Sequence, residues 1–153
     1  KELAPILLTH LADKSAEVRR AVIAVILNIS NNISISHTQT PADLATQTLI
    51  AQALIETAKN NADSQMRAEA LQALAHVPVP DATSMEQLLE ICTNGLTDTE
   101  LKVRIASAYL FGLWRHQSAL PALRQALKRE TNKECKEIIK WAIAGTVNFP
   151  PKK

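Results

Sequence analysis

The sequence predicts an all-α fold, an α-solenoid made of stacked helix pairs. The first observation behind this prediction is a cassette that recurs along the chain: an acidic residue, a short polar turn, then an apolar residue followed by arginine. It occupies residues 13–19, 63–67 and 98–104, with a weaker copy at 132–136. Its apolar position is filled by Val18, Met66, Val103 and Cys135, at spacings of 48, 37 and 32 residues. Such repetition is typical of stacked helical units, which build binding surfaces more often than reaction centres.

Composition and apolar spacing are the second and third observations. Hydrophobic residues make up 46% of the 153 residues but aromatic residues only 3%, and there are 3 glycines. This is the composition of closely packed helices, and apolar residues recur at helical spacing along most of the chain. No apolar run approaches the roughly 20 residues that span a bilayer, so no membrane segment is expected. The start at Lys1 rather than Met suggests a segment of a longer chain.

The first half of the chain is expected to hold four helices, over residues 2–12, 15–29, 41–60 and 64–76. Ser15 caps the second helix, whose β-branched residues require burial between neighbours. The polar stretch 28–40 is predicted to be an enlarged loop. A short strand around Ile33 and Ile35 is the alternative, although no partner strand is visible. The proline-containing segment 77–80 ends the fourth helix.

Four further helices are expected over residues 84–94, 99–114, 118–129 and 132–146. Ser84 is predicted to cap the first of these helices, and Gly95 to terminate it. The polar and proline-rich end, 148–153, is predicted to be a tail or linker. Paired in order, the helices predict one repeat domain over residues 1–147, with units at about 1–30, 41–76, 84–115 and 118–146.

The residues that commonly carry chemistry show no catalytic or metal-binding pattern. Cys92 and Cys135 fit small core positions, and two such thiols favour a reducing, cytoplasmic compartment. The four histidines are scattered, and no glycine-rich phosphate loop or nucleophile motif occurs. The sequence therefore predicts a protein that is not an enzyme, with no catalytic residues, no metal site and no cofactor.

At the level of its motifs the chain resembles the HEAT-repeat family, in particular the shorter HEAT-like repeats of the phycobilisome lyase type. The first helix ends Leu-Ala-Asp at Asp13, and Val103-Arg104 is followed by small residues at helical spacing and then Leu-Phe-Gly. The last unit departs from the pattern, with Arg129 where Asp is usual and Lys136 where Arg is usual. The resemblance implies a right-handed α-α superhelix of about four HEAT-like pairs, whose second helices line a concave side.

The charged residues of the cassette are interpreted as structural. An Asp ahead of a helix satisfies free N–H groups and suits the helix dipole. An arginine early in the second helix of a pair can bridge to Asp residues of its own and of neighbouring units. This predicts a structural repeat ladder rather than ligand contacts, formed by Asp13, Arg19, Asp63, Arg67, Asp98 and Arg104.

Charge is unevenly distributed along the chain. Residues 1–100 carry 6 Lys+Arg and 12 Asp+Glu, whereas residues 101–153 carry 11 and 3. Lys133, Lys136 and Lys140 share a helix face, which is interpreted either as a basic patch for an acidic protein segment or nucleic acid, or as a solvated face. Trp114 and Trp141 are predicted to be core or partly core residues.

We therefore expect a non-catalytic protein-interaction scaffold that binds on the concave second-helix surface, with the 28–40 loop as a separate contact element. The expected partner is a protein, with an acidic segment as one form of it, and packing on further repeats of a longer chain is another expected use of the surface. Electrostatic binding of nucleic acid by the basic last third is the alternative. The predicted contact residues are Arg20, Glu69, Gln72, Lys102, Arg115, Lys133, Lys136 and Lys140.

Overall fold

The computed structural model describes residues 3–11, 13–35, 40–77 and 82–148. These residues form eight α-helices, one 3-10 turn and no strand, which confirms the all-α prediction. The elements are α1 (Leu3–Leu11), α2 (Ala16–Ile35), α3 (Pro41–Asn60), α4 (Ser64–Leu74), α5 (Ala82–Gly95), α6 (Leu101–Trp114), η1 (Gln117–Ala119), α7 (Leu120–Arg129) and α8 (Lys133–Asn148). They divide into two compact units, Lys1–Glu86 and Gln87–Lys153, with the boundary inside α5.

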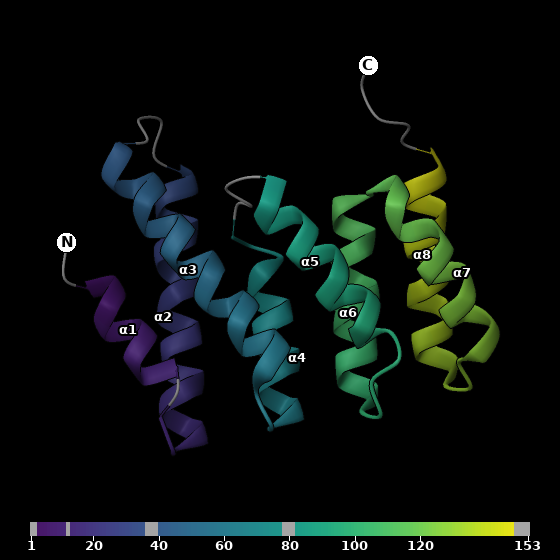
Figure 1. Cartoon of the computed structure of the whole chain (residues 1–153), viewed down its shortest axis with the longest axis horizontal. Helices are drawn as coiled ribbons and strands as arrows, with labels where there is room; N and C mark the ends of the chain where they lie inside the picture. The colour runs from purple at the N-terminus through teal and green to yellow at the C-terminus, as the bar shows by residue number, and fades with distance from the viewer. Residues whose placement is uncertain (1–2, 12, 36–39, 78–81, 149–153) are drawn as a thin grey trace. The chain divides into compact units, whose positions relative to one another are not determined.

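Unit 1 is a two-layered stack of helix pairs. Helix α1 packs on α2 and α3 packs on α4, while α1 also contacts α3 and α2 contacts α4 (Figure 1). The first helices of the two pairs therefore share one layer and the second helices share the other. The side chains buried most completely in this unit are those of Ile26, Ile50, Leu54, Met66, Leu71 and Leu74.

Unit 2 is held together by close approaches that depend on glycine. Helix α6 packs along α8, and α7 covers α8 (Figure 1). A Cβ atom on Gly112 of α6 would overlap the Trp141 ring of α8. A Cβ atom on Gly95, at the end of α5, would overlap the Ser107 hydroxyl of α6. Larger residues at these two positions would force the helices apart.

Two predicted helix boundaries are wrong in α5. The helix begins at Ala82, so Ser84 lies inside it, with a buried side chain, and does not cap it. Gly95 is the last helical residue and lacks the positive φ of a left-handed cap. Its role is steric, because it allows the Ser107 side chain to approach the backbone of α5.

The predicted loop at 28–40 is wrong for residues 28–35, which belong to α2. The apolar positions Val22, Ile26, Ile29 and Ile33 continue one helical period through this segment, and that period outweighs the high content of Asn and Ser. Residues 36–39 lie outside the described residues, as do 149–153 of the predicted tail. Helix α8 extends to Asn148, beyond its predicted end.

The apolar cassette position is buried in three of its four copies. Met66, Val103 and Cys135 have exposed fractions of 1%, 2% and 0%, but that of Val18 is 37%. In the first copy the equivalent residue therefore lies at the surface.

Candidate functional site

The cassette arginines share one hydrogen-bonding geometry. In each case the guanidinium Nη1 donates to the backbone carbonyls six and five residues earlier, so the side chain folds back over the loop that precedes its own helix. From Arg19 Nη1 the carbonyl oxygens of Asp13 and Lys14 lie at 2.9 and 3.1 Å. From Arg67 Nη1 those of Asn61 and Ala62 lie at 2.9 and 3.2 Å. From Arg104 Nη1 those of Asp98 and Thr99 lie at 3.0 and 2.9 Å. The arginines thus satisfy carbonyls that the turn leaves without helical partners.

The constant interval of six residues corrects the predicted register of two cassettes. Asp13 and Asp98 each accept a hydrogen bond from the backbone N–H two residues later. Six residues before Arg67 stands Asn61, whose Oδ1 accepts from the N–H of Asp63 at 2.9 Å. Asp63 instead occupies the N-cap position of α4 and accepts from the N–H of Gln65 at 3.0 Å.

The fourth cassette keeps an acidic residue, in contrast to the prediction that Arg129 takes its place. Six residues before Lys136 stands Glu130, whose Oε1 accepts from the N–H groups of Thr131 and Asn132 at 2.9 and 2.8 Å. Asn132 then caps α8 by accepting from the N–H of Cys135 at 3.0 Å. The Glu130 side chain is one methylene longer than aspartate, and it accepts from the backbone N–H two residues later as Asp13 and Asp98 do.

Two cassette arginines also link one helix pair to the next within a unit. In unit 1, Arg19 Nη2 donates to Asp63 Oδ2 at 2.7 Å. In unit 2, Arg104 donates through Nε to Glu130 Oε2 at 2.7 Å and through Nη2 to Oε1 at 3.3 Å. The side chain of Glu130 is only 4% exposed, so this bidentate pair is well shielded from water.

The Arg104–Glu130 pair shifts the titration of both groups and of a neighbouring thiol. The hydrogen bond from Arg104, assisted by the two backbone N–H groups, lowers the pKa of Glu130 to about 2. The same bond raises the pKa of Arg104. Burial and the nearby Glu130 raise the pKa of Cys135 to about 12, and burial raises the pKa of Cys92 as well. Both thiols are therefore protonated and unreactive at neutral pH.

Three of the predicted contact residues line one groove in unit 1. Arg20 of α2 and Glu69 and Gln72 of α4 border a hollow of about 370 Å³ between these helices. Arg20 Nε lies 3.1 Å from Glu69 Oε1, which also accepts from Gln65 Nε2 at 2.6 Å. The sequence could indicate these residues because they fall on the outward face of the second helices.

The other five predicted contact residues lie in unit 2. Lys102 is on α6, Arg115 directly follows α6, and the three lysines are on α8. Lys102, Arg115, Lys133 and Lys140 are exposed, and Lys136 is half-buried. Lys140 pairs with Glu137 at 2.7 Å, an exposed contact that lowers the pKa of Glu137. Helix α8 carries 3 lysines and 2 glutamates, so its charge is only +1. The predicted basic patch is accordingly weak on this helix.

An exposed aromatic pair on the same surface was missed by sequence reasoning. Tyr109 of α6 and Trp141 of α8 stack with ring centroids 5.5 Å apart and an interplanar angle of 17°. They are 42% and 44% exposed, so of the predicted core or partly core positions Trp141 takes the partly core one. Leu113, one turn beyond Tyr109, adds a further exposed apolar side chain. The sequence offered one signal for Tyr109, because it lies seven residues after Lys102 and therefore on the same face of the helix as that predicted contact residue.

Comparison with protein families explains the shared geometry of the cassettes. The family model described as HEAT repeats matches residues 51–144, and a second model, described as HEAT repeat, matches residues 3–33. The chain belongs to the HEAT-repeat family. Neither match bears on the phycobilisome lyase type, which stays a prediction, and no curated protein matches the chain significantly.

Membership of the HEAT family identifies the helix pairs as units of an α-solenoid and agrees with a protein-interaction role. Within the described part of the chain, no helix has the length and apolar character to cross a bilayer. Among the same residues, no cluster of three or more His, Cys, Asp or Glu side chains is placed to hold a metal ion. The surface features of these HEAT repeats are therefore the candidates for function.

Proposed function

We propose that this HEAT-repeat chain is a non-catalytic protein-interaction scaffold that binds its partner on the outward faces of its second helices. In unit 2 this is the α6/α8 surface, defined by Lys102, Tyr109, Leu113, Lys133, Lys140 and Trp141. In unit 1 it is the groove between α2 and α4. The two buried thiols support the further proposal of a reducing, cytoplasmic location.

The exposed Tyr109–Trp141 pair is the observation that carries this proposal. The chain holds only 5 aromatic residues, and two of them stack on each other at the surface. Rigid aromatic side chains dominate the binding energy of protein interfaces because they bury a large area at a small cost in conformational entropy. Lys102 of α6 and the alternating lysines and glutamates of α8 supply a charged rim around this pair.

The experiment is affinity capture from cell extract with quantitative mass spectrometry, comparing the wild type with Tyr109→Ala. Tyr109→Ala removes half of the aromatic pair without entering the space beside Gly112. The matched control is Leu49→Ala, which truncates a side chain of similar exposure (41%) on α3, a first helix of unit 1. We expect the bound proteins to be lost with Tyr109→Ala and retained with Leu49→Ala. Equal capture by all three proteins would remove the α6/α8 surface from the proposal.

Nucleic-acid binding is the second candidate, because exposed aromatic rings can stack on bases. The alternation of lysine and glutamate on α8 argues against it, since phosphate binding requires several uncompensated cations. A gel-shift series with a single-stranded oligonucleotide at rising salt separates the two candidates. A mobility change at low salt that is abolished by Tyr109→Ala would favour nucleic acid over protein.

A further inference from the structure

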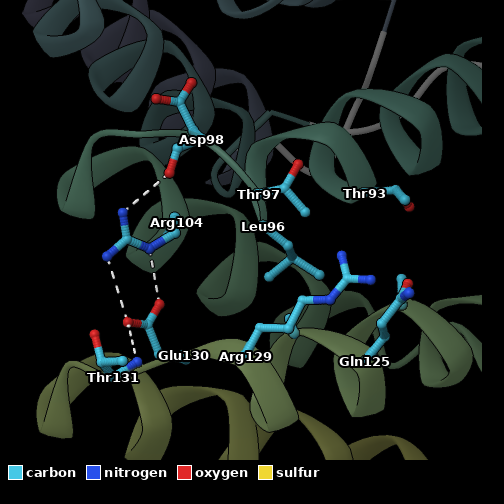
Figure 2. Close-up of a pocket in the computed structure, with 11 residues that line it drawn as sticks. Thr93, Leu96, Thr97, Asp98, Arg104, Gln125, Arg129, Glu130 and Thr131 are labelled. Atoms are coloured by element: carbon cyan, nitrogen blue, oxygen red, sulfur yellow. Dashed lines mark hydrogen bonds and ion pairs between the residues drawn. The ribbon is translucent and has the colours of Figure 1, made fainter.

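A cavity of about 380 Å³ in unit 2 lies away from the aromatic pair, between the end of α5, the start of α6 and α7. One of its walls is a single face of α7, because Ala122, Gln125, Ala126 and Arg129 follow each other at helical spacing. The opposite wall contains Thr93 and Leu96 from the end of α5 and the loop after it. Figure 2 shows these side chains around the cavity, with the Arg129 guanidinium between Leu96 and Gln125 in the view.

Three of the four charged side chains in the lining already have partners. Arg104 and Glu130 form the bidentate ion pair, and Glu130 also accepts from two backbone N–H groups. Asp98 Oδ1 accepts from the N–H of Glu100 at 2.9 Å. The Arg129 side chain is exposed, and within the described residues it makes no hydrogen bond or ion pair. One cation with five N–H donors thus stands unpaired at the edge of a cavity.

The charge of α7 strengthens this asymmetry. The helix carries Arg124, Lys128 and Arg129 and no acidic residue, whereas α8 alternates lysine with glutamate. Among the helices of unit 2, α7 therefore carries the largest uncompensated positive charge.

We propose that this cavity is a second partner-binding site that takes an acidic peptide segment, with a carboxylate on Arg129 and an adjacent aliphatic side chain on Leu96, Ala122 and Ala126. The Gln125 amide can donate a further hydrogen bond to the carboxylate. The four charged side chains of the lining sum to zero, so a monoanionic carboxylate is favoured over a phosphate dianion, which would face Asp98 and Glu130. The site goes beyond the α6/α8 surface and does not depend on it.

The test is a titration of the ¹⁵N-labelled full chain with the peptide acetyl-Leu-Glu-Leu-amide, followed by NMR. We expect shifts of the Gln125 side-chain amide, the Thr97 backbone amide and the Arg129 Nε–H. The isosteric peptide acetyl-Leu-Gln-Leu-amide should bind at least about fivefold more weakly, because charge-assisted hydrogen bonds are about twice as strong as neutral ones. Arg129→Glu should abolish the shifts, while Arg124→Glu makes the same charge change on the same helix outside the lining and should alter binding less than about twofold.

Three outcomes would overturn the proposal. Equal shifts from both peptides would mean that the carboxylate is not recognised. Equal loss in the two arginine variants would mean long-range attraction without a site. Tighter binding at the same residues by a phosphoserine peptide or a short oligonucleotide would assign the cavity to phosphate. Binding of the aromatic surface to its partner is tested separately with Tyr109→Ala, so either proposal can fail without the other.

Discussion

At the scale of single residues, Glu130 is the most completely buried charged residue in the described structure. It joins two helix pairs through Arg104 and also closes the turn before α8. A side chain that is 4% exposed holds its negative charge only because a guanidinium and two N–H groups surround it. Removing that charge leaves Arg104 without its partner in a half-buried place.

Glu130→Gln should therefore destabilise the chain by about 3 kcal/mol at neutral pH, the equivalent of the lowered pKa. The carboxylate has an ordinary value of 4.5 when unfolded and about 2 when folded. Its contribution is complete above pH 4.5 and is lost as the pH falls towards 2. Urea unfolding of both proteins at several pH values measures this difference, which should shrink steadily over that window. A difference that does not change with pH would assign the loss to packing.

Ser107 offers the opposite case, a polar group that gains nothing from burial. Its hydroxyl oxygen is fully buried and has no hydrogen-bond partner among the described residues. Ser107→Ala should therefore be neutral or stabilising by up to about 1 kcal/mol, because it removes an unsatisfied group and relaxes the contact with Gly95. Thermal unfolding monitored by circular dichroism checks this, and a clear loss of stability would reveal a hydrogen bond that the structure does not show.

The cassettes show how far sequence reasoning reaches at this scale. The arginines were found because each follows an apolar residue, a pattern that is visible in one dimension. Their partners were misassigned at Asp63 and Arg129 because the comparison was anchored on acidic side chains. The geometry that the three arginines share is instead a fixed interval of six residues to a carbonyl, which for Arg67 is the carbonyl of Asn61. In the fourth cassette Glu130 keeps the side-chain contact to the backbone N–H two residues later. In the fourth cassette Lys136 occupies the arginine position, directly after the apolar residue Cys135.

At the scale of helices, the contact between α6 and α8 depends on one glycine facing one tryptophan. The pair also affects what unit 2 presents to solvent, since the Trp141 ring lies against Gly112 and stacks with the exposed Tyr109. The apolar helical pattern around Trp141 predicted a core or partly core residue and could not decide between the two. Periodicity gives the direction of a side chain but not the depth of its burial, which depends on the neighbouring helix.

Gly112→Ala should cost about 1–3 kcal/mol, because the new methyl group would overlap the Trp141 ring. The matched control is Gly145→Ala, also a helical glycine to alanine, where the nearest atom would lie 3.7 Å from the new methyl group. That variant should be stabilised by about 0.5–1 kcal/mol through helix propensity. Denaturant titration compares the two.

A double variant tests the cause of the loss in Gly112→Ala. Truncating the ring with Trp141→Ala creates space, so the added cost of Gly112→Ala should nearly vanish in that background. Equal costs in both backgrounds would mean that the methyl group disturbs something other than Trp141.

At the scale of the whole molecule, each of the two units has interhelical ion pairs of its own. Among the described ion pairs, Arg19–Asp63 and Arg20–Glu69 link the two helix pairs of unit 1, and Arg104–Glu130 links those of unit 2. In a repeat protein each unit contacts only its neighbours, so a local loss of stability need not be shared by the whole chain. The sequence could predict the repeats, but the division at residue 86 depends on the density of packing and has no sequence signal of its own.

This separation makes a prediction that two spectroscopic probes can test. Both tryptophans of the chain, Trp114 and Trp141, lie in unit 2, whereas helical circular dichroism reports on both units. Glu130→Gln should lower the fluorescence midpoint of urea unfolding more than the dichroism midpoint. Asp63→Asn, which keeps a side chain able to cap α4 but weakens the pair with Arg19, should lower the dichroism midpoint while leaving the fluorescence midpoint nearly unchanged. If both midpoints shifted equally in both variants, the units would unfold as one cooperative body. The stability lost with one ion pair would then be shared by the whole chain.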